Sequence, residues 1–145
     1  MSNSILCAVD VSHGDEDIRT IQKAARLAAL DGAQLDVVAV IPDYGMSSVA
    51  GFFDKDHHEK MVANAKVLLD EVVTKALDGD QNANVRHIVA TGRAYEEILK
   101  LAKTTKPALI VVGAHKADLT DYLIGPNASR IVRHAKCSVY VVRDT

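Results

Sequence analysis

The sequence predicts an α/β fold: a three-layer αβα sandwich with a five-stranded parallel sheet at its centre. Two observations support this prediction. Short apolar runs alternate along the chain with stretches whose apolar residues recur at helical spacing, which is typical of a parallel sheet with helices on both faces. The chain has 145 residues, of which 48% are hydrophobic, so it can bury a core of its own. We therefore expect one domain, spanning residues 1–145.

The N-terminal part of the chain predicts a strand followed by a helix. Residues 4–10 are a nearly continuous apolar run, which suits a strand buried on both faces. Ser12 marks the expected helix start, because Asp15 and further acids place negative charge in the next turn. Apolar residues then recur at helical spacing until Gly32, which is expected to end the helix.

The middle of the chain repeats this order with a longer connection. Residues 35–41 predict a second strand, which Pro42 ends because proline cannot donate to a strand ladder. Residues 43–55 show no clean period and predict an irregular connection. A long helix follows, with apolar positions between residues 61 and 76, and Gly79 is expected to close it.

The last part of the chain completes the alternation. Residues 85–89 predict a third strand, and Gly92 begins the turn into a third helix. Residues 107–112 are apolar after their proline and predict a central strand. The final strand is expected at residues 138–142. Between these two strands a short helix is predicted to start at Asn127, with the apolar residues Ala128, Ile131, Val132 and Ala135.

Candidate ligand residues follow the expected carboxyl ends of the strands, where open parallel sheets bind their ligands. Asp10 and Val40 lie at two such ends, although Asp10 also suits a simple turn. The richest segment runs from Gly113 to Gly125 and includes His115 and Lys116. A glycine after a strand, a cation, and a glycine before a helix N-terminus together predict a phosphate cradle.

Three stretches in the last third of the chain form one pattern: Gly113-Ala114-His115-Lys116, Leu123-Ile124-Gly125-Pro126-Asn127-Ala128, and Val132-Arg133-His134-Ala135-Lys136-Cys137-Ser138-Val139. This pattern resembles the universal stress protein family, and in particular a short nucleotide-binding branch of it. The nucleotide-binding proteins of that family carry G-x2-G-x9-G-[ST] at this place. The start, Ala8-Val9-Asp10 followed by a helix, is also similar to that family.

The resemblance implies a Rossmann-like fold of the adenine nucleotide alpha hydrolase-like type. It also implies a regulatory, non-catalytic stress-response domain that binds ATP, ADP or AMP, with Mg²⁺ accompanying ATP. In the family the end of the first strand lies by the adenosine, a backbone group at the end of the second meets adenine, and the glycine motif follows ribose and phosphate. The binding residues implied here are Ala8, Val9, Asp10, Val40, Gly113, His115, Lys116, Gly125, Asn127 and Ala128.

The sequence departs from the family pattern at two positions. Lys116 stands where the motif has its second glycine, and the spacer to Gly125 is one residue short. Pro126 replaces Ser or Thr, which removes a hydroxyl and one backbone N–H from the phosphate site. Asn127 would then cap the helix and compete with an incoming anion. These departures favour an alternative: a dimeric stress interaction protein without nucleotide. A slow ATPase is a third reading, although no nucleophile–base pair is visible.

Composition, net charge and the absence of recognisable targeting segments argue against several other classes of protein. The formal net charge of −2 and the 4% aromatic content disfavour binding to nucleic acid or to an anionic membrane. Cys7 and Cys137 lie in apolar runs and are expected to be buried, without a disulfide. No signal peptide or membrane span is recognisable, so we expect a cytoplasmic protein. His57 and His58 are adjacent on a helix and do not predict a metal site.

The final strand also predicts an oligomeric state. If unpaired, it would leave an apolar edge exposed, which is a hazard for a soluble protein. Pairing with a second copy about a two-fold axis would cover that edge, and the family commonly dimerises in this way. We therefore expect a homodimer whose interface contains Val139, Tyr140, Val141 and Val142.

Overall fold

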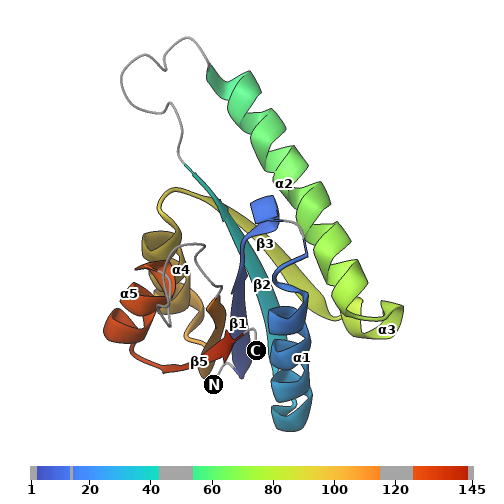
Figure 1. The fold of residues 1–145 in the computed structure, drawn as a ribbon, viewed down its shortest axis with the longest axis vertical. Coiled ribbons are helices and arrows are strands. Elements are labelled where there is room, and N and C mark those ends of the chain that lie inside the picture. Colours follow the sequence, from blue (N-terminus) through green and yellow to red (C-terminus); the bar gives the residue numbers. More distant parts are fainter. Residues whose placement is uncertain (1–2, 14, 43–53, 115–125, 144–145) are drawn as a thin grey trace.

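The computed structural model describes residues 3–13, 15–42, 54–114 and 126–143, which form three layers (Figure 1). The strands are β1 (Ser4–Val9), β2 (Gln34–Ile41), β3 (Val85–Thr91), β4 (Leu109–Ala114) and β5 (Ser138–Arg143). The helices are α1 (Ile18–Asp31), α2 (Asp54–Ala76), α3 (Gly79–Asn82), α4 (Ala94–Thr105) and α5 (Pro126–His134). A 3-10 turn, η1 (Val11–His13), follows β1.

All neighbouring strands pair in parallel, in the order β3-β2-β1-β4-β5. The chain builds the sheet outward from β1 to β3 and then returns to place β4 on the other side of β1. The strand order therefore reverses between β1 and β4. This arrangement confirms the predicted five-stranded parallel sheet, and it leaves β3 and β5 at the two edges.

Helices cover both faces of the sheet: α1 and α2 lie on one side, and α4 and α5 on the other (Figure 1). Alternate residues of β1 face different cores. Ile5, Cys7 and Val9 pack with α1 and α2, whereas Leu6 and Ala8 pack with α4 and α5. A strand that is buried on both faces needs apolar residues at successive positions, which explains the continuous apolar run at residues 5–9.

The predicted start of the first helix is wrong. Ser12 lies in η1, and its backbone N–H and its hydroxyl both donate to Asp10 Oδ1, over 2.9 and 2.5 Å. This local turn holds Ser12 in the 3-10 segment, five residues before the N-cap of the helix. Helix α1 starts at Ile18, after the N-cap residue Asp17. Its predicted end is correct, because Gly32 terminates it with a φ of 61°.

Gly79 does not close the second helix as predicted, because it opens α3. Asp78 caps this short helix: its carboxylate accepts the Gln81 N–H over 2.8 Å, and the Gln81 side chain accepts the Asp78 N–H. This reciprocal capping box stabilises a helix start directly after α2. Gly92 does form the predicted turn before α4. Its φ is 142°, and a Cβ there would lie 2.9 Å from Glu97 Cγ.

One strand boundary and the exposure of two side chains in the C-terminal half of the chain differ from prediction. The strand β4 continues through Gly113, which pairs with Val142, so Gly113 lies inside the strand and not beyond it. In α5, Ala128 and Ile131 are buried, whereas Val132 is 46% exposed. Cys7 is fully buried as expected, but Cys137 is only half-buried. The segments 43–53 and 115–125, which include part of the predicted connection and most of the predicted phosphate loop, lie outside the described residues.

Candidate functional site

A cavity of about 220 Å³ lies at the carboxyl ends of β1, β2 and β4, on the side of the sheet covered by α4 and α5. This is the point where the strand order reverses, and such points bind ligands in open parallel sheets. Its lining residues are Ala8, Val9, Asp10, Asp17, Val40, Ala94, Ile98, Val112, Gly113, Asn127, Ala128 and Ile131.

The walls of the cavity are apolar and its polar groups are few. Val40 comes from β2, Val112 from β4 and Ile98 from α4, while Asp10 supplies an exposed carboxylate just after β1. Gly113 brings the backbone of β4 to the cavity without a side chain. An apolar slot with a few polar groups suits a flat, largely apolar ligand with hydrogen-bonding edges.

A buried carboxylate fixes the backbone at the end of β1. Asp17 is 2% exposed, and its Oδ2 accepts the backbone N–H of Asp10 over 2.7 Å. The side chain of Asp10 in turn accepts the N–H and the hydroxyl of Ser12. Asp17 therefore fixes the backbone of Asp10, the residue that presents a carboxylate at the cavity.

The predicted role of Asn127 as the cap of α5 is wrong. Helix α5 begins at Pro126, so Asn127 lies within its first turn, and proline is well suited to the first helical position because it has no N–H to satisfy. The Asn127 Oδ1 accepts the backbone N–H of Tyr95 over 3.3 Å. Tyr95 lies in the first turn of α4. Asn127 therefore satisfies a free N–H of α4 and joins the starts of the two helices beside the cavity.

Aromatic and cationic side chains reinforce this junction. The Arg130 guanidinium lies over the Tyr95 ring, 4.6 Å from its centroid. The Tyr95 hydroxyl contacts Glu96 Oε1 over 3.2 Å. These contacts lie on the outer side of the junction, since none of the three residues lines the cavity. The Arg130–Tyr95 contact joins α5 to α4 and so helps to stabilise the shape of the cavity between them.

The structure brings most of the predicted binding residues to this one cavity, namely Ala8, Val9, Asp10, Val40, Gly113, Asn127 and Ala128. The other three, His115, Lys116 and Gly125, lie outside the described residues. Asp17, Ala94, Ile98, Val112 and Ile131 were not predicted. Ile98 and Ile131 have the helical spacing of core residues, so periodicity alone could not identify them. Asp17 stands among other acids before α1, and no sequence signal separates it from them.

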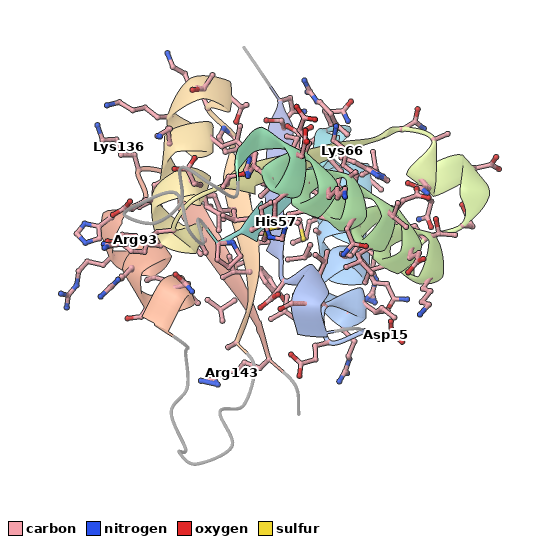
Figure 2. The ribbon with its side chains drawn as sticks, turned by 90° about the horizontal axis from the view of Figure 1, so that it is seen from above. Asp15, His57, Lys66, Arg93, Lys136 and Arg143 are labelled. Atoms are coloured by element: carbon pink, nitrogen blue, oxygen red, sulfur yellow. The ribbon has the colours of Figure 1, made fainter. Side chains whose placement is uncertain are left out.

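No group of three His, Cys, Asp or Glu side chains within the described parts of the chain could hold a metal ion. His57 lies on α2, next to His58 in sequence (Figure 2). Among the described residues, no helix is long and apolar enough to cross a membrane.

Comparisons with known proteins agree with this fold. The model of the Universal stress protein family matches residues 1–143. A putative universal stress protein of Staphylococcus epidermidis is 34% identical over 147 residues, covering 97% of this chain and 83% of the relative. A universal stress protein A homolog of Coxiella burnetii is 28% identical over 138 residues, covering 95% of this chain and 94% of the relative.

Solved structures share the architecture at lower sequence identity. The structure of hypothetical protein MJ0577 has a TM-score of 0.80 at 21% identity and covers 100% of this chain and 98% of its own. A universal stress protein in complex with cAMP has a TM-score of 0.70 at 22% identity, covering 99% and 98%. One from Archaeoglobus fulgidus in complex with dAMP has 0.60 at 20% identity, covering 97% of each chain. These likenesses confirm the predicted adenine nucleotide alpha hydrolase-like fold.

Proposed function

Because the chain belongs to the universal stress protein family by its match over residues 1–143, we propose that it is an adenine-nucleotide-binding regulatory domain of the stress response. The observation that carries this proposal is the convergence of seven predicted binding residues on the cavity at the switch point of the sheet. We propose that the protein acts by binding and not by catalysis.

The cavity has the size and chemistry for the nucleoside part of a nucleotide. Its volume of about 220 Å³ is below the roughly 300–1,000 Å³ of pockets that enclose a whole drug-sized ligand, so it suits the base and part of the sugar. The apolar side chains of Val40, Ile98 and Val112 suit the faces of an adenine ring. The Asp10 carboxylate suits a ribose hydroxyl, which donates a hydrogen bond to a carboxylate in other nucleotide-binding α/β folds.

Two relatives of the same fold support an adenine ligand. One solved universal stress protein is in complex with cAMP, and another is in complex with dAMP. Both ligands share the adenine base and differ in their sugar and phosphate. For this chain we propose adenine as the recognised group and ATP, or else ADP or AMP, as the ligand, with Mg²⁺ as a companion of ATP.

The reassignment of Asn127 removes one argument against an anion at α5. Its side-chain oxygen is bound to Tyr95 N–H, so it does not occupy the free N–H groups of its own helix. Pro126 still lacks one of those N–H groups, and Lys116 still replaces a motif glycine. Pro126 is the feature that favours the second candidate, a nucleotide-free dimeric interaction protein.

Calorimetry on purified protein tests the proposal, after denaturation of a sample to detect any adenine nucleotide that co-purifies. We expect saturable binding of ATP, and a loss of at least about tenfold in affinity for Ala128→Leu, whose larger side chain would enter the cavity. Ala24→Leu is the matched control. Ala24 is fully buried in the other core and does not line the cavity, so this variant should lose stability but keep its affinity.

The outcomes separate the candidates. No co-purified nucleotide and no heat at millimolar ATP would favour the nucleotide-free interaction protein. Equal affinity of wild type and Ala128→Leu would contradict the assignment of this cavity. Phosphate release above background that Lys116→Ala abolishes would instead indicate a slow ATPase.

A further inference from the structure

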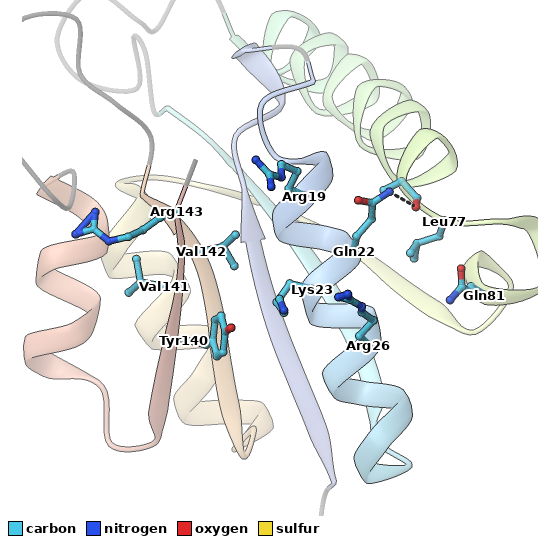
Figure 3. Close-up of a pocket in the computed structure, with 11 residues that line it drawn as sticks. Arg19, Gln22, Lys23, Arg26, Leu77, Gln81, Tyr140, Val141, Val142 and Arg143 are labelled. Atoms are coloured by element: carbon cyan, nitrogen blue, oxygen red, sulfur yellow. Dashed lines mark hydrogen bonds between the residues drawn. The ribbon is translucent and has the colours of Figure 1, made fainter. Parts of the chain in front are cut away.

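A cavity of about 550 Å³ lies between the C-terminal ends of α4 and α5 and is lined by residues 99–107 and 134–137. We call it the α4–α5 cavity. Its volume is within the roughly 300–1,000 Å³ of pockets that hold small molecules. The hollow between α1 and β5 is different, because Tyr140, Val141 and Val142 line it (Figure 3) and we assign these residues to the dimer interface. Neither they nor Val139 line the α4–α5 cavity.

The α4–α5 cavity lies at the end of the sheet where the strands begin. Of its lining residues, Pro107 precedes β4 and Cys137 precedes β5. The nucleotide cavity lies at the opposite end, where β1, β2 and β4 finish. A ligand in the α4–α5 cavity would therefore not compete with a nucleotide, and an inference about this cavity does not rest on the proposed function.

The walls of the cavity are largely aliphatic. Leu99 and Ala102 come from α4, and Pro107, Ala135 and Cys137 come from the segments that follow the two helices. Pro107 is buried, and the other four are only half-buried, so the cavity exposes the margin of the core beneath α4 and α5. Its described lining contains no aromatic side chain. These walls suit an aliphatic group better than a flat aromatic ring.

Three lysines and a histidine complete the lining: Lys103, Lys106, Lys136 and His134. All four are exposed, and none forms an ion pair with another described residue. No Asp or Glu occurs at residues 98–114 or 126–143, although the whole chain has a net charge of −2. The described chain around the cavity therefore supplies positive charge without a nearby carboxylate.

The helix ends account for only part of this charge. Cations are favourable at a helix C-terminus without any ligand, because each end carries about half a negative charge. Two helix ends would offset about one of the three lysine charges. Carbonyls near the end of α4 also have other donors: the Thr105 hydroxyl donates to Leu101 over 3.0 Å, and the Lys106 N–H donates to Ala102 over 2.8 Å. A net positive charge remains beside the apolar walls.

This combination distinguishes between classes of anion. Phosphate groups bind helix N-termini, where N–H groups point at the anion, whereas α4 and α5 both present their carbonyl ends to this cavity. An aliphatic carboxylate suits the cavity better, because its chain covers apolar walls and its single charge meets an ammonium group. We propose that the α4–α5 cavity binds a monomeric medium-chain fatty acid anion. Leu99, Ala102 and Ala135 contact its chain, and Lys103 and Lys136 bind its carboxylate.

Protection of Cys137 from alkylation tests this proposal on the intact protein. The chain has two cysteines: Cys7 is buried, and Cys137 is half-buried in the wall of the cavity. Mass spectrometry can therefore follow the reaction of Cys137 with iodoacetamide. Octanoate below its micelle-forming concentration should slow this reaction saturably. Acetate should not protect at the same concentrations, because it has no chain to bury. Uncharged 1-octanol should protect about fivefold more weakly.

A charge variant separates the lysines from the walls. Lys103→Gln, Lys136→Gln should raise the half-protecting concentration of octanoate about fivefold and leave that of 1-octanol unchanged. Lys106 is kept, because its φ of 49° ends α4. The matched control is Lys60→Gln, Lys66→Gln, which removes the same charge from exposed positions on α2, on the other face of the sheet. This control should keep the wild-type value, and circular dichroism checks that both variants fold.

Four outcomes would overturn the proposal. The absence of protection by octanoate would mean that the cavity does not bind the chain. Equal shifts in both variants would mean that only overall charge matters. Protection by inorganic tripolyphosphate at a lower concentration than octanoate would indicate a phosphate ligand. Reaction of Cys137 in a Tyr140→Lys variant but not in wild type would show that a second copy covers the cavity.

Discussion

At the scale of single residues, Asp17 links the fold to the proposed site. Its buried carboxylate accepts the Asp10 N–H over 2.7 Å. Asp17→Ala removes that acceptor, so we expect the free energy of unfolding to fall by about 1–3 kcal/mol. The affinity for nucleotide should fall as well, because the end of β1 loses its anchor. Asp17→Asn keeps an oxygen acceptor and should lose less of both. Urea denaturation and calorimetry measure the two effects, and wild-type values for Asp17→Ala would contradict this role.

The thiol of Cys7 makes stability depend on alkaline pH. Burial raises the pKa of Cys7 well above its ordinary value of 9.0, and the charge of Asp17 raises it further. Below pH 9 the thiol is protonated in both states. Above that pH the unfolded chain loses the proton while the folded chain keeps it, so stability falls as pH rises, by up to about 1.4 kcal/mol per pH unit. Urea denaturation between neutral and strongly alkaline pH measures this decline.

Two alanine variants isolate the contribution of Cys7. Cys7→Ala should show a shallower alkaline decline than wild type, whatever its stability at neutral pH. Cys137→Ala should keep the larger part of the decline, because Cys137 is only half-buried; burial raises its pKa and a backbone hydrogen bond lowers it. Identical slopes for wild type and Cys7→Ala would show that the thiol does not titrate differently in the two states.

At the scale of secondary-structure elements, Asn127 connects the starts of α4 and α5. Asn127→Ala leaves the Tyr95 N–H without this acceptor, and loss of a helix-capping contact costs about 0.5–2 kcal/mol. Asn127→Asp keeps the acceptor and adds negative charge at the start of α4, so stability should be retained. The same charge should repel a nucleotide phosphate and weaken ATP binding. Thermal unfolding and calorimetry separate the two effects, and equal stability of all three proteins would contradict the junction.

Sequence patterns were sufficient to predict which helices and strands form, but not where each helix begins. The spacing of apolar residues and the positions of turn glycines predicted the existence and type of every strand and long helix. Burial of an element on one or two faces requires apolar residues at a regular spacing, and this spacing can be read from the sequence. Helix ends were less predictable. Ser12 and Asn127 are both good cap residues, yet Asp10 binds the first and Tyr95 of a distant helix uses the second. Single-residue propensities cannot distinguish a local partner from a tertiary one.

At the scale of the whole molecule, the position of the site was predictable and its walls were not. The ends of β1, β2 and β4 are adjacent because of strand order, and the family resemblance named residues at each of them. Ile98 and Ile131 reach the same cavity from α4 and α5, but only the packing of both helices on one sheet face brings them there.

The edge position of β5 leads to a prediction for the whole assembly. Strand β5 pairs only with β4 among the described residues, and we propose that its free edge pairs with a second copy through Val139, Tyr140, Val141 and Val142. Tyr140→Lys would place a charge at this edge in both copies. Sedimentation should then show a dimer for wild type and a monomer for the variant at micromolar concentration. Val67→Lys, at a 56% exposed position on α2, is the matched control and should remain dimeric. A wild-type monomer would contradict the proposed interface.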